Sequence, residues 1–257
     1  MSKKHNLFVL LTVIFLTNAL LAEMIGVKIF SGEATLGVPP AQIKLFGDWV
    51  LDFNLTAGVI LWPVVFITTD IINEYFGRKG VQRISFLTVG CISFAFLAIW
   101  IITTLPPADF WLAVNGTDPN GNNFDIDFAF NKIFRQGLGI ILGSLVAFLI
   151  GQLLDVMVFQ KLKRITGESK VWLRATGSTL VSQFVDSFVV LFIAFYFLAP
   201  EGSRWSVEQV TSVGIINYIY KFVIAILLTP LIYIAHYFID RYLGSDAEKI
   251  KEDALAN

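Results

Sequence analysis

Long apolar runs, bounded by charged residues, prolines or glycines, dominate the pattern along this chain. Six runs are long enough to cross a bilayer, because a hydrocarbon core of about 30 Å needs about 20 mostly apolar residues in a helix. They are Leu7–Ile29, Leu55–Phe76, Val81–Leu105, Leu138–Phe159, Val171–Leu198 and Val213–Ile239. The pattern therefore predicts an all-α polytopic membrane protein with six transmembrane helices.

The composition leads to the same class. Of the 257 residues, 56% are hydrophobic and 15% are charged, and the mean hydropathy is +0.70. Soluble domains have about 45–50% apolar and about 25% charged residues. One protein core cannot hide so much apolar surface, so we expect lipid to cover the rest. The net charge of −1 gives no basic patch for a nucleic acid, and we expect no nucleic-acid partner.

Lysine and arginine set the expected orientation, since basic residues are retained in the cytoplasm. With the amino terminus inside, thirteen of the 19 basic residues fall in cytoplasmic segments and four fall outside, while Lys28 and Lys221 lie in or at the ends of spans. We therefore expect both termini to be cytoplasmic. Residues 1–243 would form the transmembrane domain, and residues 244–257 a charged cytoplasmic tail that frays.

Two outer segments have patterns of their own. Residues 43–53 alternate around Gly47 and Asp48, which predicts a short hairpin with a two-residue turn. In the long outer segment 106–136, the apolar residues from Phe124 to Phe134 recur at helical spacing. This spacing predicts an interfacial helix that leads into the fourth span.

Ionisable and amide side chains inside the spans are the candidate functional residues, because they cost free energy in a bilayer and face a bundle interior or a cavity. Three spans each carry a pair at i, i+3, which places both side chains on one helix face. Spans one and six add further polar residues, and Glu74 follows one pair. The set is Asp70 with Asn73, Gln152 with Asp155, Gln183 with Asp186, and Asn18, Glu23, Glu74 and Lys221.

A structural role competes with a functional one for each of these residues. Asp70 and Glu74 lie near basic residues and could serve topology or structure. Asp155 and Asp186 are set deeper in apolar sequence, which favours function. Lys221 lies about two turns into its span, which favours a role as counter-ion or ligand. Membrane helices also use polar residues simply to hold one helix to another.

Small residues and prolines shape the predicted bundle. A row of small residues on the fourth span, and Ser178 with Ser182 on the fifth, would let helices approach closely. Pro63 and Pro230 would kink spans two and six near their middles. The row on the fourth span is Gly139, Gly143, Ala147 and Gly151.

Enzymatic and ATPase motifs are missing from the sequence. There is no phosphate-binding loop, no H-E-x-x-H and no G-x-S-x-G. The single cysteine, Cys91, forms no internal disulfide, and the two histidines make no metal pair. We therefore expect no enzyme, no metal and no cofactor.

Three acidic motifs in order resemble those of the VUT family of queuosine precursor transporters. They are the segments 66–79 (FITTDIINEYFGRK), 144–159 (SLVAFLIGQLLDVMVF) and 178–187 (STLVSQFVDS). The resemblance extends over nearly the whole chain, including the segment from Asn18 to Lys28, Pro63, and Lys221 with Pro230. Many members have Tyr-Gly where this chain has Tyr75-Phe76-Gly77, and the long outer segment 106–136 is unusual.

The resemblance implies uptake of a 7-deazaguanine precursor of queuosine, such as 7-cyano-7-deazaguanine, across the plasma membrane. It also implies a fold that resembles the six-helix substrate-binding components of energy-coupling-factor vitamin transporters. Carboxylates could accept the ring N–H and amino donors of such a ligand, and Gln, Asn or Lys could donate to its carbonyl. Trp62 or Phe184 could stack on the ring.

Two modes of transport remain open on the sequence alone. The chain could be a carrier that works without an ATPase, or a substrate-binding subunit of an ATP-driven energy-coupling-factor complex. Such subunits dock through rows of small residues on early helices, and only Ala19 and Ala22 offer one here. The buried carboxyls could carry a proton or bind ligand without one. A homo-oligomer is also left open.

Overall fold

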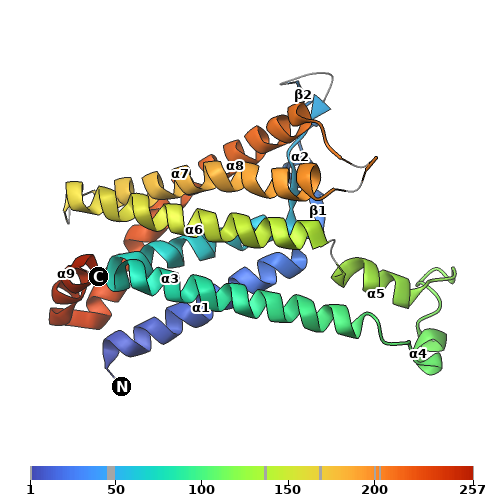
Figure 1. Cartoon of the computed structure of the whole chain (residues 1–257), viewed down its shortest axis with the longest axis horizontal. Coiled ribbons are helices and arrows are strands. Elements are labelled where there is room, and N and C mark those ends of the chain that lie inside the picture. The colour runs from blue at the N-terminus through green and yellow to red at the C-terminus, as the bar shows by residue number, and fades with distance from the viewer. Residues whose placement is uncertain are drawn as a thin grey trace.

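Five helices in the computed structural model are long and apolar enough to cross a membrane. The structure describes residues 2–44, 50–135, 138–167, 170–199, 201–202 and 204–256. The five rods are α1 (Lys3–Ile25), α3 (Trp62–Ile102), α6 (Leu138–Thr166), α7 (Val171–Leu191), which continues as the π-helix η2 (Phe192–Phe197), and α8 (Val207–Leu243). Figure 1 shows α1, α3, α6 and α7 lying lengthwise beside one another, with α8 crossing at a steeper angle.

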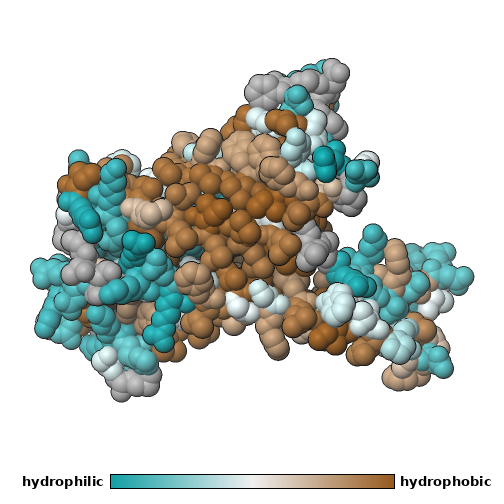
Figure 2. Space-filling view, viewed as in Figure 1, coloured by the Kyte–Doolittle hydropathy of each residue, from teal (hydrophilic) through white to brown (hydrophobic). Residues whose placement is uncertain are grey.

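The outer surfaces of the five long helices are too apolar to face water. No more than 39% of the apolar window of any of the five helices is buried inside the protein. Figure 2 shows a broad apolar band over the middle of the rods and hydrophilic residues at both ends. Because lipid is the environment that accepts such a band, the chain is a multi-pass membrane protein.

Helix α3 contains two of the six predicted spans. The chain bends inside it at Gly77, whose φ of 67° and ψ of −168° are not helical. Figure 1 shows the two parts of α3 meeting at the end of the bundle where α9 lies. Only glycine adopts this backbone conformation at low cost. The two predicted spans are therefore the two parts of α3, which meet in a sharp turn at Gly77.

The start of α3 corrects the expectation for Pro63. The predicted span began at Leu55, but residues 54–56 form strand β4 (Asn54–Thr56), which pairs antiparallel with β1 (Ile29–Ser31), and η1 (Ala57–Ile60) follows. Pro63 therefore lies in the first turn of α3, where its missing N–H breaks no hydrogen bond. It does not kink the middle of a span. Pro230 does lie inside a helix, α8.

The outer segments form small elements at the end of the bundle away from α9. Strands β2 (Ile43–Lys44) and β3 (Val50–Leu51) pair antiparallel, as the predicted hairpin requires, while its turn at Gly47 and Asp48 lies outside the described residues. The short helix α2 (Gly32–Leu36) follows β1, and α4 (Asp109–Val114) precedes α5 (Ile126–Phe134). The predicted helix near Phe124–Phe134 is thus present, and Asp125 caps it by accepting from the Phe128 N–H at 2.9 Å.

The carboxyl-terminal segment was predicted to fray, and this prediction is wrong. Residues 244–246 form η3 (Gly244–Asp246), and residues 247–256 form helix α9 (Ala247–Ala256). Ala247, Ile250 and Ala254 are buried, and the backbone of Ala254 lies directly against Gly77. An apolar stripe at i, i+3 and i+7 therefore docks the segment on α3 despite its high charge.

Small residues bring α6 and α7 together as predicted. A Cβ atom at Gly143 would lie 3.1 Å from the carbonyl oxygen of Val190, and one at Gly151 would lie 3.7 Å from Cβ of Asp186. Ala147 is buried between them. The row therefore sets how closely Asp186 approaches α6.

We predict that Gly77→Ala destabilises the protein by about 1–3 kcal/mol, because the alanine would occupy a backbone region available to glycine and its Cβ would meet the Ala254 backbone. Thermal unfolding followed by tryptophan fluorescence measures the loss. Gly90→Ala is the matched control, since a Cβ at Gly90 meets no atom within 4 Å. Equal melting temperatures for the two variants would contradict the assigned role of Gly77.

Candidate functional site

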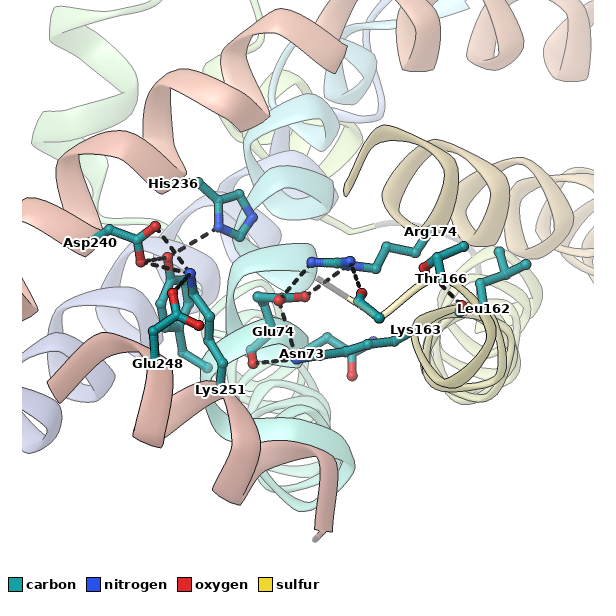
Figure 3. A network of polar contacts seen from close by, with 12 residues as sticks. Asn73, Glu74, Leu162, Lys163, Thr166, Arg174, His236, Asp240, Glu248 and Lys251 are labelled. Carbon is teal, nitrogen blue, oxygen red and sulfur yellow. Dashed lines mark hydrogen bonds and ion pairs between the residues drawn. The ribbon is translucent and has the colours of Figure 1, made fainter. Parts of the chain in front are cut away.

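A buried carboxylate joins three helices at the end of the bundle where α9 lies. Glu74 of α3 pairs with Lys163 of α6 at 3.2 Å and with Arg174 of α7 at 2.8 Å, and each of these side chains is 1% exposed. The guanidinium also donates through Nε to the second carboxylate oxygen at 3.1 Å. Figure 3 shows the two cations converging on this carboxylate. We call Glu74, Lys163, Arg174, Asn73 and Gln160 the basal cluster.

Backbone carbonyls and an amide pair complete the basal cluster. Lys163 donates to the carbonyl of Glu74 at 3.1 Å, and Arg174 donates to the carbonyl of Gly167 at 2.7 Å. Beside them Gln160 of α6 donates to the Oδ1 atom of Asn73 at 2.7 Å. Because hydrogen bonds occupy these charged groups, the cluster holds α3, α6 and α7 in register.

A second polar group ties α9 to α3 and α8. The Tyr75 hydroxyl donates to Asp240 at 2.7 Å and lies 3.1 Å from Nδ1 of His236. Lys251 of α9 forms an ion pair with Asp240 at 3.0 Å and lies 5.5 Å from the centre of the Tyr75 ring. Figure 3 shows this group next to the basal cluster. The segment Asn73-Glu74-Tyr75 therefore makes contacts toward four helices, α6, α7, α8 and α9.

Two further acids lie deeper in the bundle. Asp70 is 2% exposed and Asp155 is 4% exposed. Oδ1 of Asp155 lies 3.3 Å from the Ser182 hydroxyl and 3.5 Å from the Thr179 hydroxyl. Asp70 Oδ1 and Asp155 Oδ2 are buried and have no hydrogen-bond partner among the described residues. We call Asp70 and Asp155 the central acids.

The predicted amide residues lie next to the central acids. Gln152, one turn before Asp155, lies 3.4 Å from the Thr69 hydroxyl through its Oε1 atom. Gln183, one turn after Thr179, is buried with its Oε1 atom unpartnered. A buried acceptor that is left unpaired costs free energy. A ligand that donates a hydrogen bond to Gln183 would remove this cost.

An ion pair lies farther from the basal cluster. Asp186 of α7 and Lys221 of α8 bond through Oδ2 and Nζ, and their side chains are 22% and 19% exposed. The Cα of Gly151 leaves room for Asp186 beside α6. We call Asp186 and Lys221 the distal pair. Lys221, for which the sequence predicts a role as counter-ion or ligand, thus lies against Asp186.

The remaining predicted residues have separate surroundings. Glu23 is buried and accepts from the Ser144 hydroxyl at 2.9 Å. Asn18 donates to the carbonyl of Ile14 in its own helix at 2.8 Å. Trp62 stacks on Phe66 with ring centres 6.0 Å apart. Phe184, the alternative to Trp62 as a stacking ring, is 51% exposed.

Two hollows border the described helices. A crevice lined by Asp70, Thr179 and residues of α8 holds about 10 Å³, about the space of one water molecule. A larger hollow of about 290 Å³ lies between α1 and α8 and contains none of the predicted site residues. The crevice at Asp70 thus has room for an ion or a water, but a bicyclic ligand would not fit there.

Sequence reasoning missed the partners of Glu74. Lys163 and Arg174 were counted only as basic residues that set the orientation, yet both are 1% exposed. The sequence around Lys163 and Arg174 did not indicate their burial, because a basic residue at the cytoplasmic surface and a buried one have the same appearance in sequence. His236 was set aside as a lone histidine and lies against Tyr75.

An apolar helical bundle with buried acids, amides and an internal ion pair defines a multi-pass membrane transporter. The chain belongs to the family described as "Putative vitamin uptake transporter", which matches residues 56–235. The matched segment contains all three acidic motifs and the distal pair. The predicted family resemblance is thereby confirmed.

Relatives of this chain are described as queuosine precursor transporters. The "Probable queuosine precursor transporter" of Bacillus subtilis is 28% identical over 216 residues, which cover 82% of this chain and 83% of the relative. The "Queuosine precursor transporter" of Escherichia coli is 28% identical over 177 residues, covering 69% of this chain and 70% of the relative. No solved structure matches the chain.

We predict that Glu74→Gln destabilises the folded protein by about 3–5 kcal/mol, because it leaves Lys163 and Arg174 buried without their carboxylate. Membrane abundance and the melting temperature of the purified variant measure the effect. Glu248→Gln is the matched control, since Glu248 is 73% exposed and lies 3.7 Å from Lys251. A Glu74→Gln variant as stable as this control would show that the basal cluster does not hold the helices.

Proposed function

We propose that this protein imports a queuosine precursor, such as 7-cyano-7-deazaguanine or a related 7-deazapurine, across the plasma membrane as a carrier that needs no ATPase. Family membership and the names of the relatives support the substrate class. The observation that carries the proposal is the distal pair beside the unpartnered oxygen of Gln183. These groups together offer both acceptors and a donor to one ligand.

The chemistry of a guanine-like edge fits these groups. The ring N–H and the amino group are adjacent donors, and the Asp186 carboxylate and the Gln183 oxygen are acceptors one helical turn apart. The neighbouring ring carbonyl accepts a hydrogen bond, and Lys221 supplies an ammonium donor. In the closed bundle Asp186 and Lys221 bond to each other, so they stay paired until a ligand replaces that contact.

The other predicted residues are proposed to line the same path. Asn18, Glu23, Trp62 and Gln152 would lie along it, with Trp62 offering a ring face for stacking. Asp70 and Asp155 would close the path toward the basal cluster. Asn73 and Glu74, whose side-chain oxygens already bond within the protein, would hold the helices below it.

Transport without an ATPase module is supported by the burial of the α1 small residues. Ala19 is 0% exposed and Ala22 is 2% exposed, and a Cβ at Gly58 would lie 2.6 Å from the Ala22 carbonyl oxygen. The row that could dock a partner is thus occupied by this chain's own residues. Since cellular enzymes would consume the imported ligand, downhill flow is sufficient to sustain uptake.

We also propose six passes with both termini in the cytoplasm. Counting the two parts of α3 separately gives six apolar helical segments. The start of α1 and helix α9 lie at the same end of the bundle, on the left of Figure 1, as an even number of passes requires. The basic residues of the basal cluster lie at that end, which is the cytoplasmic one under the positive-inside rule.

Purified protein in liposomes should import labelled 7-cyano-7-deazaguanine without ATP or a partner protein, and Asp186→Asn should reduce the rate at least tenfold. The substitution turns part of an acceptor into a donor, which costs about 1–3 kcal/mol at a buried contact. Asp109→Asn, in exposed α4, should transport normally. Uptake that appears only with an added ATPase module would favour the energy-coupling alternative, and full activity of Asp186→Asn would exclude the proposed contact.

The orientation has its own test in whole cells. In a Cys91→Ser background, a cysteine at the exposed position Asn120 should react with an impermeant maleimide added outside. A cysteine at the exposed position Arg164, at the basal end of α6, should be protected until the membrane is opened. The reverse pattern of labelling would place the termini outside the cell.

A further inference from the structure

The central acids form no ion pair within the described part of the chain. Asp70 and Asp155 are almost fully buried, and each has one oxygen without a hydrogen-bond partner. Within the described ranges, the ion pairs of the bundle involve Glu74 and Asp186 but neither central acid. A buried carboxylate without a countercharge is very unfavourable, so either a proton or a bound cation must neutralise it.

The helix register brings the two acids to the same level. On α6 and α3, Gln152 contacts Thr69 and Gln160 contacts Asn73, which places Asp155 opposite Asp70 between these two contacts. On α7 the hydroxyls of Thr179 and Ser182 face Asp155. Asp70 and Thr179 line the same crevice, whose volume is about 10 Å³. Thr179 therefore borders both the crevice at Asp70 and the Oδ1 atom of Asp155, so that oxygen atoms of α3, α6 and α7 gather around this hydroxyl.

This group of oxygen atoms is short of hydrogen atoms. The Ser182 hydroxyl can donate to the carbonyl of Thr179 at 3.0 Å, which is closer than its contact with Asp155 at 3.3 Å. Since a hydroxyl has a single hydrogen, Ser182 can serve either the Thr179 carbonyl or Asp155 but not both. The acceptors around the central acids therefore outnumber the hydrogens that these hydroxyls supply.

We propose that Asp70, Asp155 and the hydroxyls of Thr179 and Ser182 bind one sodium ion between α3, α6 and α7. Carboxylate, amide and hydroxyl oxygens are the ligands that hard cations prefer. Sodium has nearly the radius of calcium, which binds oxygen at about 2.3–2.6 Å, so ligands at right angles lie about 3.3–3.7 Å apart. The separations of 3.3 and 3.5 Å between Asp155 and the hydroxyls match this spacing.

The size of the site favours sodium over magnesium, which would need its ligands closer together. The basal cluster places Lys163 and Arg174 around the single carboxylate of Glu74 and so has a net charge of +1 beside the two central acids. The remaining charge is −1, which one monovalent cation neutralises.

The site would couple sodium to transport. Thr179 and Ser182 lie on α7 within one to two turns of Gln183 and Asp186, so an ion that fixes α7 against α6 and α3 also fixes the proposed ligand contacts. This consequence rests on the proposed function, whereas the ion site itself does not. A sodium gradient would then drive accumulation of a neutral ligand.

Sodium binding is measured without any organic ligand. The full-length chain in detergent should bind one labelled sodium ion per chain in a saturable manner, and its melting temperature should rise with the logarithm of sodium concentration when choline replaces sodium at constant ionic strength. Asp155→Asn and Asp70→Asn should lose both responses. Asp109→Asn, which changes an exposed aspartate of α4, should keep them.

Several outcomes would overturn the site. Equal melting temperatures in sodium and choline would exclude it, and so would stabilisation by acid alone, which would assign a proton to the central acids. Stabilisation by calcium with no response to sodium would exclude a monovalent ion. If the aspartate variants do not fold, competition of lithium and potassium against labelled sodium on the native chain still decides. Sodium binding with no uptake in liposomes would retain the site and reject the transport function.

Discussion

The ion pairs of Glu74 are the interaction on which the rest of the bundle depends. A carboxylate that is 1% exposed must be paired, because desolvation of a buried charge costs several kcal/mol. Its partners come from α6 and α7, so the three helices can meet in only one register. In a membrane, where apolar side chains gain little by leaving lipid for protein, such polar contacts carry much of the specificity.

The basal cluster also fixes what lies above it. Once α3 and α6 are aligned at Asn73 and Gln160, the central acids face each other one turn away. The small residues of α6 then allow α7 to approach, and Gly151 admits Asp186 beside it. The basal cluster, the central acids and the distal pair therefore follow one another along the bundle, and each group is adjacent to the next. A ligand or ion that enters one group changes the electrostatic potential at the others.

Much of the fold could be predicted from sequence, since apolar length and basic bias are local properties. The apolar segments, the helix near Phe128 and the close packing at Gly143 follow from spacing alone. The turn at Gly77 was not recognised, because a single glycine in a helical pattern is also tolerated without a turn. The docked helix α9 had a readable signal in Ala247, Ile250 and Ala254, whose apolar spacing was outweighed by the charge of the tail.

The candidate site was harder to predict, because partners depend on tertiary register. The i, i+3 pairs indicated which helix faces turn inward, and Asp70, Gln152, Asp155 and Gln183 are indeed buried. Spacing could not reveal that Glu74 pairs with two cations while the central acids have none, since that difference depends on which helices meet.

The distal pair and the basal cluster differ in how readily their bonds can break. The crevice of about 10 Å³ at Asp70 accommodates an ion or a water but no ring, so a ligand that entered there would have to separate the helices. Asp186 and Lys221 are about one-fifth exposed, whereas the partners of Glu74 are fully buried, so breaking the distal pair leaves less buried charge unpaired. Opening is accordingly expected at the distal end while the basal cluster stays closed. Release to the other side would require the contacts of Glu74, Tyr75 and Asp240 to loosen in turn, and α9, which is held by Lys251 and by its contact with Gly77, would move with them.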